Sequence, residues 1–207
     1  MIADLKKIFA SVIVVFAILG GSISQAKTYD TIENLNKAFE IETNASNMYS
    51  KYAEKAELEG YPAIAKLFRA ASFSEILHAR NHLAVIEGLG GKAKIIELKP
   101  VKPGTTIANL AGASSVERES ELKVYSHFIE QADKDGLKNA RESFKFAWDS
   151  ELQHAKLFIT RLKNSKDIQK NTDFYVDIKS GETVEVKPGE VPPKSKLPDG
   201  VYVKAAF

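Results

Sequence analysis

The 207-residue chain contains no cysteine, and only two methionines and one tryptophan. The absence of thiols excludes disulfides, zinc-thiolate sites and iron-sulfur clusters. The charge is nearly balanced, with 29 basic and 27 acidic residues and a net charge of +2, so nothing indicates a nucleic-acid partner. With 44% hydrophobic residues, the chain is typical of one globular domain with a small appendage.

The N-terminus predicts an export signal over residues 1–26. Lysines precede the apolar run 8–20, and small residues then frame a cleavage site before Lys27. A bilayer-spanning helix takes about 20 apolar residues, so we expect cleavage, a periplasmic location and no stable membrane insertion afterwards. An uncleaved N-terminal anchor is the alternative.

Residues 27–163 show the periodicity of long helices. The predicted helices cover residues 30–59, 62–87, 106–135 and 137–163. Asp30 with Glu33 is the predicted cap of the first helix, and Gly60 and Gly136 end the first and third. Glycine- and proline-containing residues 88–105 have no helical period, which predicts a long crossover between helices two and three. The expected fold is therefore mainly α, a four-helix bundle.

Residues 164–207 differ in kind, because they hold four of the seven prolines and three short alternating segments. The segments are residues 174–178, 182–187 and 201–205. Turn signals at Ser180-Gly181 and Asp199-Gly200 separate them. This tail is predicted to be a small β module.

The helical region contains an internal repeat with an offset of 76 residues. The offset pairs Tyr49 with Tyr125, Gly60 with Gly136, Phe68 with Phe144, Ala71 with Ala147, Glu75 with Glu151 and His78 with His154. A Glu-x-x-His pair therefore occurs twice, in "SEILHAR" and in "SELQHAK". Residues three apart share a helix face, so each pair converges on one spot.

Glu42 and Glu117 complete a set suited to two metal ions. They lie 33 and 34 residues before the two Glu-x-x-His pairs, across each helical hairpin, and di-metal bundles take one glutamate from each of two helices and Glu-x-x-His from the others. Four carboxylates neutralise two ferrous ions, and an empty site would crowd buried charges, so metal should stabilise the fold. Mixed carboxylate and imidazole ligands suit iron, with manganese or zinc as alternatives.

The segments "AFEIETNASNMYSKYAEKAELEGY", "SEILHARNHLAVIEGLGG", "TIANLAGASSVERESELKVYSHF" and "SELQHAKLF" resemble rubrerythrin, a ferritin-like di-iron family. The resemblance implies a di-iron site as the catalytic centre and a homodimer. The implied iron ligands are Glu42, Glu75, His78, Glu117, Glu151 and His154. It also implies that Tyr49 and Tyr125 lie beside the irons and hydrogen-bond ligand carboxylates.

Two departures from the family bear on function. Rubrerythrins carry a further glutamate where this chain has Ser120, and Glu121 is a candidate substitute ligand. The tail keeps the length and hairpin pattern of a rubredoxin module without its cysteines, with Asp177 and Ser180 at the place of the first pair. No rubredoxin-type iron is therefore expected, and electrons must come from an unidentified external donor.

Less specific interpretations stand beside these. The six ligands could form buried salt bridges, and the tyrosines could be ordinary core residues. His82 and His127 are expected on the surface or next to the ligands. Glu117 precedes Tyr125 by eight residues whereas Glu42 precedes Tyr49 by seven, which predicts a π-bulge in the third helix.

The preferred function is a rubrerythrin-type oxidoreductase that reduces hydrogen peroxide or dioxygen and protects against oxidative stress. The alternative is a ferroxidase or iron-sequestering protein that uses the same site. A structural or partner-binding bundle with an incidental metal is the third hypothesis.

Overall fold

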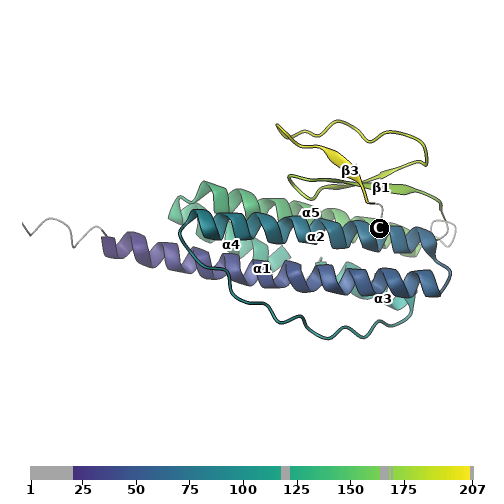
Figure 1. Cartoon of the computed structure of the whole chain (residues 1–207), viewed down its shortest axis with the longest axis horizontal. Helices are drawn as coiled ribbons and strands as arrows, with labels where there is room; N and C mark the ends of the chain where they lie inside the picture. The colour runs from purple at the N-terminus through teal and green to yellow at the C-terminus, as the bar shows by residue number, and fades with distance from the viewer. Residues whose placement is uncertain (1–20, 118–121, 164–167, 169, 206–207) are drawn as a thin grey trace, which may run out of the picture.

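The computed structural model describes residues 21–117, 122–163, 168 and 170–205, with side chains from Asp30 onward. Within these ranges it contains five helices and one three-stranded sheet (Figure 1). The elements are α1 (Gly21–Leu58), α2 (Pro62–Gly88), α3 (Thr106–Val116), α4 (Leu122–Asp135), α5 (Lys138–Lys163), β1 (Asp173–Asp177), β2 (Thr183–Val186) and β3 (Tyr202–Lys204). The mainly α prediction with a C-terminal β module is confirmed.

The predicted third helix is described in two parts, α3 and α4. Glu117, directly after α3, has a π-helical hydrogen-bond pattern, as the unequal spacing to the tyrosines predicts. Gly60 and Gly136 follow helix ends with φ of +78° and +71°, which a glycine adopts at little cost. The predicted cap at Asp30 is wrong, because α1 already starts at Gly21 and Asp30 lies inside it.

The crossover over residues 89–105 runs along α1 and is held there by asparagines. Asn36 Oδ1 accepts a hydrogen bond from the backbone of Lys94 (2.7 Å), and Asn44 Oδ1 accepts one from Lys99 (2.8 Å). At its end, Glu59 Oε2 accepts a hydrogen bond from Thr106 N (2.7 Å) at the start of α3. These bonds satisfy backbone donors that no regular element pairs.

The β module lies against α2 and α5 (Figure 1). Its strand order is β2-β1-β3, and both strand pairs are antiparallel. Phe174 and Val176 of β1 belong to the same buried apolar cluster as Leu67 and Phe68 of α2. Arg161 of α5, which is buried, contacts Glu185 at 3.0 Å. Apolar packing and the ion pair between buried Arg161 and partly exposed Glu185 therefore attach the module to the bundle.

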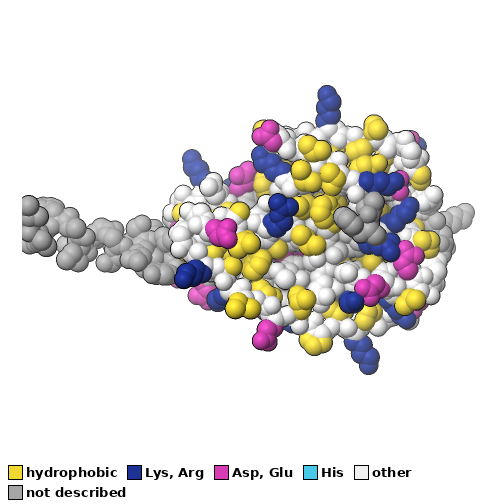
Figure 2. Space-filling view, viewed as in Figure 1, with side chains coloured by type: hydrophobic (Ala, Val, Ile, Leu, Met, Phe, Trp, Pro, Cys, Tyr) yellow, Lys and Arg dark blue, Asp and Glu magenta, His cyan; other side chains and the backbone are white. Residues whose placement is uncertain are grey.

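A second apolar cluster contains Leu35, Tyr125, Phe128 and Phe144. It fills the end of the bundle where α2 ends and α5 begins, whereas the first cluster lies toward the start of α2. On the face seen in Figure 2, charged side chains of both signs are interspersed with apolar ones. None of the helices in the described part of the chain is long and apolar enough to span a membrane.

Candidate metal centre

The bundle brings all six predicted ligands together in its interior, where each is at most 1% exposed. They are Glu42 of α1, Glu75 and His78 of α2, Glu117 after α3, and Glu151 and His154 of α5. Four carboxylates and two imidazoles at such depth are unusual in a protein core unless something compensates their burial.

The ligands form two groups that share Glu75 and Glu151. The first group, called the Glu42 position, adds Glu42 and His78 to the shared pair; the second, called the Glu117 position, adds Glu117 and His154. In each group one ligand atom from every residue lies within 4.8 Å of the others. Two cations held at these positions would share the carboxylates of Glu75 and Glu151.

Glu75 lies between the two ligand histidines. Its Oε2 is 2.9 Å from His78 Nδ1, and its Oε1 is 3.1 Å from His154 Nδ1. Burial opposes ionisation, but the charge and hydrogen bonding of His154 and His78 outweigh it and lower the pKa of Glu75 to about 2.

Two buried atoms of this site show whether a metal would fit there. Glu75 Oε1 and His154 Nδ1 are buried and face each other at 3.1 Å, and among the described residues neither atom has a hydrogen-bond partner outside this pair. Both are atoms that bind metals through lone pairs. A cation would satisfy both, and the carboxylate and imidazole set suits iron, manganese or zinc.

The outer nitrogens of both histidines are held by the β1–β2 turn and by the first residue of β2. His78 Nε2 is 3.0 Å from the carbonyl oxygen of Ser180, and His154 Nε2 is 3.2 Å from Thr183 Oγ1. A carbonyl can only accept, so His78 carries a proton on Nε2, and Nδ1 is the nitrogen that would face a metal once it gives up its own proton. The β module thus orients the ligands.

Gly181 lets the turn approach the histidine this closely. A Cβ at this position would lie 2.2 Å from His78 Nε2, and the residue has φ of +79°. Ser74 Oγ fastens the same turn by donating a hydrogen bond to the Gly181 carbonyl (2.7 Å). Only glycine satisfies both the contact and the backbone conformation.

The two tyrosines donate to the two unshared glutamates, as the resemblance implies. The Tyr125 hydroxyl of α4 donates a hydrogen bond to Glu42, and the Tyr49 hydroxyl of α1 donates one to Glu117. Each tyrosine therefore reaches a carboxylate from the other half of the repeat. The bonds hold the carboxylates in place for a metal.

His82 is also part of the centre, and it is fully buried. Its Nδ1 is 2.8 Å from Ser143 Oγ, and its Nε2 is 3.4 Å from the Tyr125 hydroxyl and 3.9 Å from Glu42 Oε1. Burial, with a smaller contribution from the charge on His78, lowers the pKa of His82 to about 3. His82 is therefore neutral at ordinary pH.

Other predicted residues lie elsewhere. His127 is exposed on α4, whereas Ser120 and Glu121 lie outside the described residues. Asp177 is buried in the β module, where its Oδ1 accepts hydrogen bonds from the backbone of Lys179 (2.8 Å) and Ser180 (3.1 Å).

Sequence reasoning missed Ser143 and Thr183. The sequence did contain a signal for Ser143. The 76-residue offset pairs polar Ser143 with apolar Leu67 and polar His82 with apolar Phe158, so the two halves differ at these positions in the same way. No comparable pattern points to Thr183.

Comparison with known proteins places these residues in a family. The family model described as Rubrerythrin matches residues 33–162. Rubrerythrin-1 of Clostridium acetobutylicum is 33% identical over 152 residues, which are 71% of this chain and 75% of that protein. Nigerythrin of Nitratidesulfovibrio vulgaris is 28% identical and covers 74% of this chain and 75% of its own.

Solved structures agree in fold. The structure titled "Fully reduced state of nigerythrin (all ferrous)" superposes with a TM-score of 0.72 at 26% identity, covering 84% of this chain and 86% of that chain. The bacterioferritin of Desulfovibrio desulfuricans has a TM-score of 0.65 at 20% identity, over 71% of this chain and 86% of its own, and shows the ferritin-like fold alone. With the family model spanning the segment that supplies all six buried ligands, this chain belongs to the rubrerythrin family.

Proposed function

We propose that this chain is a non-haem di-iron oxidoreductase that reduces hydrogen peroxide or dioxygen with electrons from an external donor. The observation that carries the proposal is the pair of buried four-residue groups joined by Glu75 and Glu151. Two redox-active metals held by these residues would supply two electrons at one place. The nigerythrin structure described as all ferrous supports iron as the metal.

Bound iron would supply the two electrons that, with two protons, reduce one hydrogen peroxide to two waters, and the donor would restore the electrons. The chain's own residues would bind and orient the metals: Glu75 and Glu151 would be shared between them, and His78 and His154 would offer Nδ1 because Ser180 and Thr183 engage Nε2. The depth of the ligands excludes bulk water from the centre. A small substrate such as peroxide suits so enclosed a site.

Anaerobic reconstitution with ferrous iron tests the proposal. We expect two irons per chain and sustained peroxide consumption when a chemical donor is added. The Glu75→Ala, Glu151→Ala double variant should lose both properties, while Glu54→Ala, Glu130→Ala, which removes two exposed glutamates, should keep them. Peroxide consumption that does not depend on iron would refute the proposal.

The alternative is a ferroxidase or iron-sequestering protein with the same ligands. Ser120, at the place of the family's additional glutamate, favours it, because that glutamate takes part in the family's redox change. In the reconstitution experiment, one round of iron oxidation followed by no further turnover, even with donor present, would support this alternative.

The export signal and the origin of the tail are further proposals. We propose that the mature protein begins at Lys27 in the periplasm, which N-terminal sequencing of fractionated cells would test.

We also propose that residues 164–207 are a rubredoxin-like module without its iron. The nigerythrin match supports this, since its 84% coverage exceeds what the bundle alone can supply. We also propose a homodimer, which the resemblance to rubrerythrins implies and which light scattering would test.

A further inference from the structure

A hydrogen-bonded chain leads from the surface to one side of the metal centre. Ser143 lines a surface pocket of about 570 Å³ between the end of α2 and the start of α5. From Ser143 the chain continues to His82 (2.8 Å), to the Tyr125 hydroxyl (3.4 Å) and then to Glu42. Four side chains from four different helices are thus linked to the Glu42 position.

The direction of every hydrogen bond in this chain follows from the bond between Tyr125 and Glu42. The Tyr125 hydroxyl gives its hydrogen to the Glu42 carboxylate, so its oxygen can only accept a hydrogen from His82. Neutral His82 then carries its hydrogen on Nε2, and its Nδ1 accepts from Ser143. All donors therefore point toward Glu42, and bonds aligned in this way strengthen one another.

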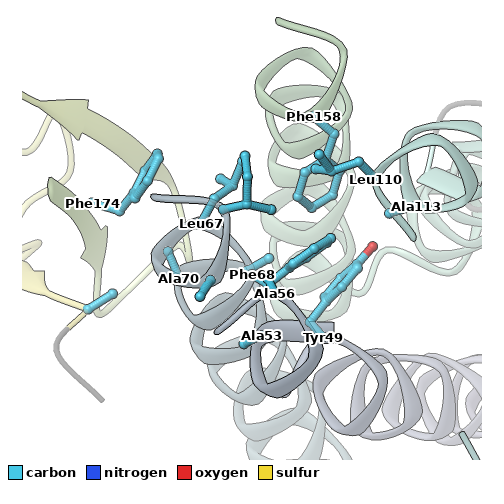
Figure 3. Close-up of a cluster of buried hydrophobic side chains, with 14 of the residues drawn as sticks. Tyr49, Ala53, Ala56, Leu67, Phe68, Ala70, Leu110, Ala113, Phe158 and Phe174 are labelled. Atoms are coloured by element: carbon cyan, nitrogen blue, oxygen red, sulfur yellow. The ribbon is translucent and has the colours of Figure 1, made fainter. Parts of the chain in front are cut away.

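The other half of the repeat has no such chain at the corresponding positions. The 76-residue offset places Phe158 opposite His82 and Leu67 opposite Ser143. Both are fully buried in an apolar cluster, and Figure 3 shows Phe158 near Tyr49, with ring centroids 5.6 Å apart. These positions can thus be filled by hydrocarbon alone, whereas burying His82 and Ser143 carries a desolvation cost.

We infer that His82 is a positioning residue of the Glu42 position, which holds the Tyr125 hydroxyl on Glu42 and makes the two metal positions unequal. This inference rests on the proposed metal-dependent function. His82 acts through Tyr125, because its Nε2 is closer to the Tyr125 oxygen (3.4 Å) than to Glu42 (3.9 Å). Removing such an outer contact typically weakens metal binding about 10- to 100-fold.

The test is a titration of the metal-free chain with Co²⁺, followed by visible absorption and calorimetry. The variant His82→Phe, Ser143→Leu installs the side chains that the other half already uses. We expect one of the two Co²⁺ affinities to fall about tenfold and the other to stay within about threefold. The matched control is Ser126→Leu, His127→Phe, the same substitutions at two exposed positions, which should bind Co²⁺ as the wild type does.

A double-mutant cycle separates positioning from packing. In a Tyr125→Phe background the His82 and Ser143 substitutions should have no further effect on Co²⁺ affinity, because the group that they act through is gone. His82→Gln, which keeps an N–H donor, should restore most of the lost affinity. Additive effects in the cycle, equal losses at both positions, or unchanged affinities would each overturn the inference.

The same titration separates this inference from the proposed function. Wild-type protein that fails to bind two Co²⁺ ions would contradict both. Two bound ions in the wild type with an unaffected His82→Phe, Ser143→Leu variant would contradict only the role of His82.

Discussion

Tyr125 and Tyr49 donate hydrogen bonds to Glu42 and Glu117 on opposite sides of the metal centre, but their rings lie in different surroundings. Tyr125 is near His82, which bonds Ser143, whereas Tyr49 packs against Phe158 and, at 6.0 Å, Phe68. The halves of the repeat keep the same ligands and the same tyrosines. They differ in the residues that surround the two tyrosines, which are polar around Tyr125 and apolar around Tyr49.

The histidines show the same contrast. His78 is held by a backbone carbonyl, that of Ser180, and His154 by a side chain, the Thr183 hydroxyl. A backbone contact survives most substitutions at its residue, whereas a side-chain contact does not. The two metal positions should therefore respond differently to mutation, and this difference can be measured.

The largest expected effect separates shared from unshared ligands. Glu75 belongs to both metal positions and Glu42 to only one, so Glu75→Ala should abolish iron uptake at both, while Glu42→Ala should leave one iron per chain. Iron analysis after anaerobic reconstitution and desalting measures this, with Glu33→Ala at the surface as control. One iron retained by Glu75→Ala would mean that the positions are not bridged as the geometry indicates.

The next effect concerns the turn over His78. Gly181→Ala should destabilise the protein by about 1–3 kcal/mol from the left-handed backbone alone, and more because its Cβ would lie 2.2 Å from His78 Nε2. Gly189→Ala is the matched control, since Gly189 has φ of +85° with nothing within 4 Å of its Cβ position. Urea unfolding of the metal-free protein gives both values. If both variants lost the same free energy of unfolding, the close contact between the turn and His78 would not limit the residue at position 181.

These supporting contacts mark the limit of what the sequence could predict. The six ligands were predictable because Glu-x-x-His recurs in register, and helix periodicity fixes which residues share a face. Gly60 and Gly136 likewise marked helix ends. The docking of the β1–β2 turn was not predictable, because Thr183 meets His154 through tertiary packing that no spacing encodes. For His82, helical spacing fitted both a surface position and a buried one beside the ligands, and only the packing against Ser143 and Tyr125 decides between them.

A third prediction uses the contrast between the histidines directly. Thr183→Val removes the hydroxyl beside His154 and should weaken one metal position about tenfold, by letting the imidazole turn. Ser180→Ala keeps the carbonyl that holds His78 and should change both affinities by less than about threefold. Co²⁺ titrations of the two variants make the comparison. If Ser180→Ala weakened binding as much as Thr183→Val, the backbone contact would not be what orients His78.

The smallest expected effect lies at the ends of the two halves, where Glu59 and Asp135 occupy equivalent positions of the repeat. Glu59 Oε2 accepts from Thr106 N at the start of α3 (2.7 Å), and Asp135 Oδ2 accepts from Thr31 Oγ1 of α1 (2.7 Å). The hydrogen bond with Thr106, aided by Lys55, lowers the pKa of Glu59 to about 2 from 4.5.

Because the folded state lowers this pKa, the ionised Glu59 stabilises the fold fully above about pH 4.5, and the contribution is lost as the pH falls toward 2. Glu59→Gln keeps an acceptor oxygen but cannot titrate. Wild type should therefore have the higher melting temperature at pH 7, and its advantage should shrink between pH 5 and pH 3. Glu54→Gln, an exposed position on the same helix, controls for the lost charge. A constant difference across this range would mean that the bond to Thr106 N stabilises α3 without regard to the charge on Glu59.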